Sequence, residues 1–173
     1  MDDRSVSCLF TGHRALPEDR VEVEKLQELT AQAIRDAYAA GFRVFYAGGA
    51  VGFDMLASVE LLNARSAGLH DVKLILALPH FGHYKKWKGV EQRVFAKILQ
   101  RADEVVYLES EYKPGCMQQR NRYMVQRCAR CICYCNKSTG GTAYTVEQAK
   151  KAGLTIVNLA ESAQISFFDE KNA

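Results

Sequence analysis

No apolar run in the sequence approaches the ~18–20 residues that a membrane-spanning helix requires. The first residues, MDDRSVS, contain neither a basic nor an apolar segment, so we expect no signal peptide and a cytoplasmic location. Only 3 prolines and 12 glycines are present, which excludes collagen-like and low-complexity chains. A chain of 173 residues that is 48% hydrophobic instead fits one globular domain over residues 1–173. We expect its core at about 5–159 and a tail at 160–173.

Acidic residues are absent from two long stretches, although the net charge is only +3. Residues 112–146 and 79–90 contain no Asp or Glu but several Lys, Arg and His residues. If the fold gathers these residues on one face, that face would suit an anionic ligand. A basic face that is merely solvated would have the same pattern. The charge distribution alone leaves both interpretations open.

Disulfides are not expected from the six cysteines, because they are rare in the cytosol. The run CARCICYC contains a CxxC spacing of the kind found in zinc sites, but no second CxxC completes a four-ligand site. The apolar alternation predicts a strand that places Cys131, Cys133 and Cys135 on one face. We therefore expect buried core cysteines, Cys128 among them, and no metal site. A metal or redox role is the alternative.

Short apolar runs alternate with longer amphipathic segments along the chain. The apolar runs predict strands at 6–10, 42–47, 72–78, 104–108, 131–135 and 154–159. The amphipathic segments predict helices at 17–40, 52–67, 92–101, 118–128 and 145–152. This order predicts a Rossmann-like α/β fold, with a doubly wound parallel sheet at the centre of three α/β/α layers in a single domain.

The loops that follow the strands should collect at the carboxyl edge of this sheet, where open α/β sheets bind ligands. The loops after the second and fifth strands are rich in glycine, which lets backbone N–H groups approach a phosphate at a helix N-terminus. Neither loop matches the P-loop or the G-x-G-x-x-G pattern. The nucleotide-binding residues that we predict are Gly12, His13, Arg14, Gly48, Gly49, Gly52, Asp54, Arg120, Asn121, Thr139, Gly140, Gly141 and Thr142.

Several of these side chains have a second interpretation. Asp54, at a helix start, either stabilises the helix dipole or contacts ribose hydroxyls or a water. Arg120 either donates a bidentate pair of hydrogen bonds to a phosphate or is solvated on its helix. The hydroxyls of Thr139 and Thr142 either cap the last helix or reach a phosphate. Three aromatic residues that either stack on a base or pack in the core are Tyr84, Trp87 and Tyr144.

Five segments together carry a family resemblance. They are TGHR at 11–14, AGGAVGFDMLA at 47–57, ADEVVYL at 102–108, GCMQQRNRYMV at 115–125 and GGTAYTVEQAKKAG at 140–153. In this order they resemble the SLOG superfamily, and within it the DUF1273, or YpsA-like, group of small bacterial proteins, over about residues 5–159. The resemblance implies a Rossmann-like sheet that binds a nucleotide or a related nucleoside phosphate through the two glycine loops.

Two better-known SLOG groups imply different activities. GGAVGFDMLA is similar to an element of the DprA family, whose members bind single-stranded DNA. Residues 116–121 and 140–142 are similar to the LOG enzymes, which cleave the N-glycosidic bond of nucleoside monophosphates. The LOG pattern is M-x-x-R-K followed by P-G-G-x-G-T-x-x-E. This chain has Asn121 in place of the lysine and Thr145 in place of the catalytic glutamate.

Glycosidic cleavage normally uses a carboxylate to stabilise an oxocarbenium-like centre or to activate water. Without a glutamate at position 145, another acid would have to serve. The candidate catalytic residues are Asp54, the acid of the glycine loops, and Glu147, which lies two positions late on its helix and so points elsewhere.

Our leading hypothesis is a protein that binds or senses a nucleotide or a nucleotide derivative, such as ADP-ribose or an NAD-related compound. It requires no cofactor beyond that ligand. The alternatives are a LOG-like nucleoside 5′-monophosphate N-glycosidase and a DprA-like single-stranded DNA-binding protein. The sequence leaves open whether the protein is an enzyme. We expect no membrane partner, and a homo-oligomer fits the family although no interface is readable.

Overall fold

The computed structural model describes residues 3–162. In this part of the chain, six parallel strands form one sheet in the order β4-β3-β2-β1-β5-β6. The strands are β1 (Ser7–Gly12), β2 (Val44–Ala47), β3 (Lys73–Leu78), β4 (Glu104–Tyr107), β5 (Arg130–Tyr134) and β6 (Thr155–Asn158).

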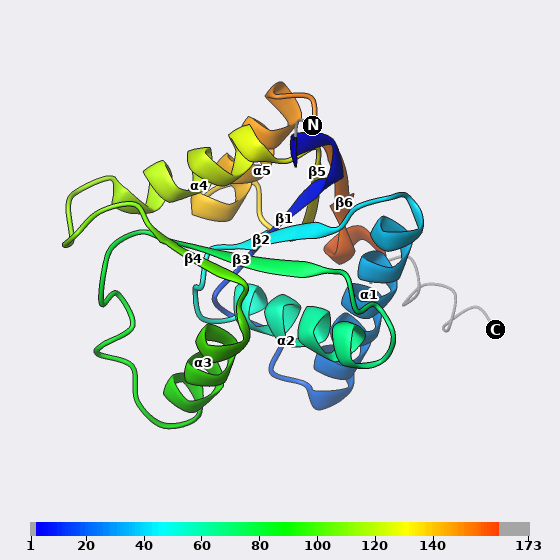
Figure 1. The fold of residues 1–173 in the computed structure, drawn as a ribbon, viewed down its shortest axis with the longest axis horizontal. Helices are drawn as coiled ribbons and strands as arrows, with labels where there is room; N and C mark the ends of the chain where they lie inside the picture. Colours follow the sequence, from blue (N-terminus) through cyan, green and yellow to red (C-terminus); the bar gives the residue numbers. More distant parts are fainter. Residues whose placement is uncertain (1–2, 163–173) are drawn as a thin grey trace.

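Helices cover both faces of the sheet, which confirms the predicted Rossmann-like, three-layer α/β/α fold (Figure 1). On one face lie α1 (Arg20–Ala39), α2 (Phe53–Ser66) and α3 (Gly89–Arg101). On the other lie α4 (Cys116–Arg127) and α5 (Gly141–Lys151), and a short 3-10 helix, η1 (Asp3–Val6), precedes β1. None of the helices within residues 3–162 has the length and apolar character needed to cross a membrane.

The strand order reverses at β1. The chain adds β2, β3 and β4 on one side of β1 and then returns to place β5 and β6 on the other side. β1 and β5 run in register from the Cys8–Arg130 pair to the Gly12–Tyr134 pair, so their carboxyl ends lie together. Open α/β sheets bind ligands at such a switch point, because the loops after the two strands diverge to opposite faces there.

Alternating side chains of the strands fill two separate cores. Phe10 and Phe45 pack beneath α1 and α2, whereas Leu9 and Tyr46, their sequence neighbours, pack beneath α4 and α5. Successive residues of a strand point to opposite faces of the sheet, so buried strands read as continuous apolar runs. The apolar runs in the sequence therefore report a sheet that is covered on both sides.

The cysteines of β5 belong to the α4/α5 core. Cys131 and Cys133 are fully buried there together with Cys128, as the alternating pattern predicted, and Cys135 is half-buried at the edge of the same core. Burial raises the pKa of the Cys8 thiol, on the other face, to about 12. Burial of this kind keeps thiols protonated and unreactive. Among residues 3–162, no cluster of His, Cys, Asp and Glu could hold a metal ion.

Four helices begin two or more residues from their predicted starts, among them α3, which begins at Gly89 rather than at 92. α1 begins at Arg20 rather than at 17, because Asp19 caps it by accepting the Glu22 N–H at 3.0 Å. α4 begins at Cys116 rather than at 118, after Gly115 in the left-handed conformation. α5 begins at Gly141 rather than at 145, after Gly140, and no side chain caps it. The capping interpretation of Thr139 and Thr142 therefore does not hold.

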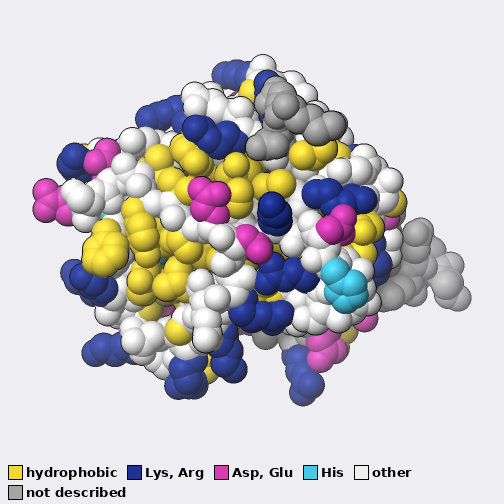
Figure 2. Space-filling view, in the orientation of Figure 1, with side chains coloured by type: hydrophobic (Ala, Val, Ile, Leu, Met, Phe, Trp, Pro, Cys, Tyr) yellow, Lys and Arg dark blue, Asp and Glu magenta, His cyan; other side chains and the backbone are white. Residues whose placement is uncertain are grey.

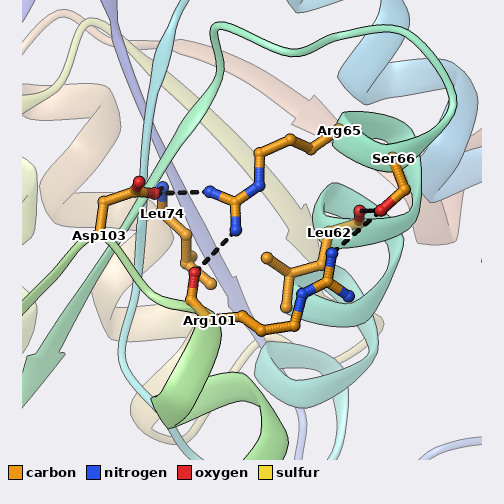
Figure 3. A network of polar contacts seen from close by, with 6 residues as sticks. All are labelled: Leu62, Arg65, Ser66, Leu74, Arg101 and Asp103. Carbon is orange, nitrogen blue, oxygen red and sulfur yellow. Dashed lines mark hydrogen bonds and ion pairs between the residues drawn. The ribbon is translucent and has the colours of Figure 1, made fainter.

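A network of polar contacts fixes the amino-terminal end of the sheet (Figure 3). Arg65 on α2 donates to Asp103 Oδ2 and to the carbonyl oxygen of Arg101, both at 2.7 Å. The same carboxylate oxygen of Asp103 accepts the Leu74 N–H of β3 at 2.8 Å, and Arg101 donates to Ser66 Oγ at 3.0 Å. These contacts tie the ends of α2 and α3 to β3 and β4, at the edge opposite the glycine loops.

At one border of the sheet, β4 leaves its outer side without a partner strand among residues 3–162. Val105, Val106 and Tyr107 are half-buried, and the exposed Phe81 ring contacts the Tyr107 ring with centroids 5.2 Å apart. Apolar side chains gather over this border in the space-filling view (Figure 2).

Candidate functional site

A cavity of about 490 Å³ opens at the carboxyl ends of β1 and β5, where the strand order reverses. Its walls come from the loops after β1, β2 and β5 and from the amino-terminal parts of α2, α4 and α5. Most of the nucleotide-binding residues predicted from the sequence line it. They are Gly12, His13, Arg14, Asp54, Arg120, Asn121, Thr139, Gly140, Gly141 and Thr142.

A buried acid and a buried base form part of the cavity wall. Asp54 is 5% exposed and Arg120 is 6% exposed, so Arg120 is not the solvated helix residue of the second interpretation. Burial raises the pKa of the Asp54 carboxyl to about 6, although the neighbouring Arg120 and the N–H groups of Ala50 and Gly48 act to lower it. Burial also lowers the pKa of Arg120, and Asp54 opposes that shift. Each of these two buried groups thus stabilises the charge of the other.

Arg120 is held in place by contacts to two different elements. Its Nη1 donates to the carbonyl oxygen of Gly48, after β2, and its Nε donates to Oδ1 of Asn121 at 2.7 Å. Asn121 Nδ2 in turn donates to Thr145 Oγ1 at 2.9 Å, and the Thr145 hydroxyl donates to the Gly141 carbonyl at 2.9 Å. A continuous chain of hydrogen bonds therefore links the β2 loop to the starts of α4 and α5.

Positive side chains lie at the rim of the cavity. Arg14 and Lys137 line it and are exposed, and neither side chain has a hydrogen bond or ion pair within residues 3–162. His13 is different, because its Nε2 accepts the Asn136 N–H at 3.0 Å. Burial and the nearby Lys137 lower the pKa of His13, so the imidazole is neutral at pH 7 and connects the β1 loop to the β5 loop.

The glycine turn after β5 faces open space. A Cβ atom built at Gly140 or Gly141 would meet no other atom within 4 Å. Both glycines line the cavity, and they begin α5 without a side-chain cap. An uncapped helix start with an unobstructed backbone attracts anions, because its N–H groups and the helix dipole both favour negative charge.

The glycine loop after β2 packs against the protein instead. The structure does not bring Gly48, Gly49 and Gly52 to the cavity wall. A Cβ at Gly49 would lie 2.5 Å from Leu78 Cδ2, and a Cβ at Gly52 would lie 2.5 Å from the carbonyl oxygen of His13. The tight packing at these positions accounts for the glycines without a ligand. Of the glycines in the two loops, only Gly140 and Gly141 therefore line the cavity, and the predicted contact of backbone with phosphate stays a prediction.

Glu147, predicted as a candidate catalytic acid, is exposed on α5 and does not line the cavity. Four lining residues were not among the predicted site residues: Thr11, Ala50, Met117 and Lys137. A signal existed for Lys137, which lies two residues after the fifth predicted strand, within the acid-free stretch. Met117 falls in the C-M-Q-Q-R-N segment that carries the resemblance.

The three ambiguous aromatic residues separate into two groups. Tyr84 and Trp87 pack against Phe95, with ring centroids 4.9 Å and 5.1 Å apart, and border the core beneath α3. They line no part of the cavity, which agrees with the packing interpretation. Tyr144, on the first turn of α5, is 48% exposed and does not belong to either core.

Comparison with known proteins matches residues 8–167 to the family model described as the YspA SLOG family. In sequence, the chain is similar to the uncharacterised SPbeta prophage-derived protein YoqJ of Bacillus subtilis (strain 168). The two are 28% identical over 124 residues, which cover 64% of this chain and 71% of YoqJ.

Two solved structures of DNA processing protein A have a similar fold. The protein from Helicobacter pylori, whose structure concerns its single-stranded DNA binding mode, superposes with a TM-score of 0.63 at 20% identity. The match covers 89% of this chain and 65% of that protein. The protein from Streptococcus pneumoniae superposes with a TM-score of 0.57 at 20% identity, over 87% of this chain and 48% of that one. The chain thus spans somewhat less than two thirds of the Helicobacter pylori protein and about half of the Streptococcus pneumoniae protein. At this level of identity the similarity concerns the fold alone.

Proposed function

Because the chain belongs to the YspA SLOG family, we propose that its switch-point cavity binds a nucleotide or a nucleotide derivative, such as ADP-ribose or an NAD-related compound. The observation that carries this proposal is the open Gly140–Gly141 turn, which begins an uncapped helix and lines the same cavity as the exposed cations Arg14 and Lys137. Phosphate groups are the part of the ligand that this arrangement would hold.

The charge that remains available for a ligand comes from the rim. Arg120 already donates to Gly48 and Asn121 and lies beside Asp54, so its charge is largely compensated within the protein. The exposed side chains of Arg14 and Lys137 make no hydrogen bond or ion pair within residues 3–162. Two cations that face a helix start favour a ligand with one or two phosphate groups over a neutral sugar or base alone.

The size of the cavity agrees with a small-molecule ligand. Small-molecule sites generally have volumes of ~300–1,000 Å³, and the cavity measures about 490 Å³. Its lining combines backbone N–H groups, hydroxyls and charged side chains, which suits the sugar and phosphate of a nucleotide. We therefore favour a binding or sensing role in which the ligand remains intact.

Cleavage of an N-glycosidic bond is the second candidate, because one carboxyl does line the cavity. The pKa of Asp54 is raised to about 6, so its carboxyl can exchange a proton near neutral pH. Against it, Asp54 is buried beside Arg120, and position 145 holds a threonine whose hydroxyl is already hydrogen-bonded. Glu147 is outside the cavity.

The test is a thermal-shift series with AMP, ADP-ribose and NAD, followed by analysis of each mixture for products. A ligand at ~100 times its dissociation constant should stabilise the fold by ~2.7 kcal/mol and be recovered unchanged. Release of free base would instead favour the glycosidase. Single-stranded DNA would also present phosphates to the cavity. No shift with any nucleotide, together with salt-sensitive binding of a single-stranded oligonucleotide, would replace the proposal with a DprA-like function.

A further inference from the structure

A second cavity, of about 340 Å³, adjoins the first one. The two cavities share Met117, Asn121, Gly140 and Gly141 in their walls, so they meet at the open glycine turn. Gln118 and Tyr144 complete the lining of the second cavity. All of its lining residues are uncharged, whereas the first cavity is lined by Arg14, Arg120, Lys137 and Asp54.

Tyr144 is the notable side chain in the second cavity. It is 48% exposed and makes no hydrogen bond or ring contact within residues 3–162. The other exposed aromatic rings in this part of the chain have neighbours, because Phe81 contacts Tyr107 and Tyr112 contacts His80. An exposed ring without a partner, at the wall of an uncharged cavity, offers a free face to a planar apolar group.

Gln118 provides the polar group that is free to read the edge of such a planar ligand. Both ends of the Asn121 amide are already used, since Oδ1 accepts from Arg120 and Nδ2 donates to Thr145. The Gln118 amide has no hydrogen bond within residues 3–162 and carries one acceptor oxygen and two donor hydrogens. Such an amide can pair with the adjacent acceptor and donor of adenine, whose two fused rings also cover more of an aromatic face than the single ring of a pyrimidine does.

We propose that the second cavity is the nucleobase subsite of this protein and that it selects adenine. The base lies against Tyr144 and Met117, Gln118 reads its edge, and the phosphate lies in the first cavity across the glycine turn. This inference rests on the proposed function, because it requires a phosphate in the first cavity. The division between a charged and an uncharged cavity matches the division of a nucleotide into an anionic phosphate and a neutral base.

The test compares AMP with ribose 5-phosphate, which keeps the phosphate and lacks the base, by isothermal titration calorimetry. Wild-type protein should bind AMP at least ~10-fold more tightly than ribose 5-phosphate, since stacking on an aromatic ring contributes about tenfold per base. Tyr144→Ala should remove most of this advantage without changing the affinity for ribose 5-phosphate. Tyr144→Phe should keep the advantage, and Tyr112→Ala, an exposed tyrosine outside both cavities, should behave as wild type.

Adenine selection is tested with Gln118→Ala, and Gln126→Ala serves as the matched control on the exposed side of α4. Wild type should prefer AMP to UMP, and Gln118→Ala should reduce that preference. Equal affinity of wild type for AMP and ribose 5-phosphate would overturn the subsite but leave the proposed function standing. An equal loss of affinity for AMP and for ribose 5-phosphate in Tyr144→Ala would also overturn the subsite. Absence of binding by both probes would overturn the proposed function and the subsite together.

Discussion

Asn121 Nδ2 donates a hydrogen bond to Thr145 Oγ1 over 2.9 Å, so two uncharged side chains join the first turns of α4 and α5. These are two of the positions at which the chain departs from the LOG pattern, which has a lysine and a catalytic glutamate there. The pair positions its neighbours: Asn121 accepts from Arg120, and Thr145 donates to the carbonyl of Gly141. In this chain the two positions hold the site in shape and offer no acid for catalysis.

Thr145→Val should therefore destabilise the protein without a change in side-chain volume. The valine cannot accept from Asn121 Nδ2, and loss of a buried partner costs ~1–3 kcal/mol. The free energy of unfolding in urea measures the effect. Thr142→Val removes a half-buried hydroxyl from the same helix turn that has no hydrogen bond within residues 3–162, and we expect a change below ~0.5 kcal/mol. Equal effects of the two substitutions would show that the Asn121–Thr145 bond contributes nothing.

Arg14→Ala should weaken nucleotide binding and leave stability unchanged. The side chain is exposed at the cavity rim and makes no hydrogen bond or ion pair within residues 3–162, so its removal breaks neither kind of contact in the free protein. A charged hydrogen bond to phosphate contributes ~1.5–3 kcal/mol, which corresponds to a loss of affinity of about 10–150-fold. Calorimetric titration with AMP measures it, with Arg122→Ala on the exposed side of α4 as the control. Unchanged affinity in Arg14→Ala would remove this arginine from the phosphate site.

Glycine substitutions in the two loops should have opposite effects. Gly141→Ala places its methyl in open space, and alanine is favoured over glycine within a helix by ~0.5–1 kcal/mol, so the melting temperature should hold or rise. The methyl would nevertheless obstruct phosphate, and nucleotide affinity should fall.

Gly49→Ala should instead destabilise the fold. Gly49 has a φ of +66°, and a Cβ there lies 2.5 Å from Leu78 Cδ2, so we expect a loss of ~1–3 kcal/mol. Thermal unfolding and AMP titration of both variants check the contrast. Normal binding in Gly141→Ala would indicate that phosphate does not approach the second loop.

Asp54 should make anion binding depend on pH. Its pKa is raised to about 6, so the carboxyl is ionised at about pH 7.5 and protonated at about pH 5. Protonation removes a negative charge beside Arg120 and Arg14, so an anion should bind several-fold more tightly at the lower pH. ADP-ribose is the suitable probe, because its pyrophosphate diester keeps a constant charge over this range.

Two variants assign that pH dependence. Asp54→Asn should flatten it if the carboxyl is responsible. His13, whose pKa is lowered by burial and Lys137, would gain charge in the same direction at low pH, and His13→Ala isolates its share. Tighter binding of ADP-ribose at about pH 7.5 would contradict the expected sign. It would indicate that the ionised carboxylate itself accepts a hydrogen bond from the ligand, as from a ribose hydroxyl.

The order of strands and helices was readable from the sequence because both faces of the sheet are covered. A continuous apolar run such as residues 72–78 indicates a strand that is buried on both faces of the sheet. The amphipathic segments between such runs form the helices that bury these faces. Helix starts were less accurate. At Arg20 the start depends on the Asp19 side chain, and at Gly141 it depends on a glycine in an unusual conformation, neither of which apolar periodicity reports.

The candidate site was only partly readable. The loops that meet at the switch point follow from the alternation of elements, which is why Arg14 and Gly141 were predicted together. Packing between residues that are distant in the sequence could not be predicted. Gly49 packs against Leu78 at the end of β3, and Asn121 of α4 bonds Thr145 of α5, and both relationships depend on how separate elements pack together. A glycine that faces a ligand and a glycine that faces a neighbouring side chain look the same in a sequence.

The most direct test of the account is a crystal structure of the protein with AMP. We expect AMP to be bound intact in the cavity between the ends of β1 and β5. Its phosphate oxygens should lie within hydrogen-bond distance of the Gly140–Gly141 backbone and of Arg14. A phosphate bound elsewhere, while this cavity holds no part of the nucleotide, would contradict the central claim.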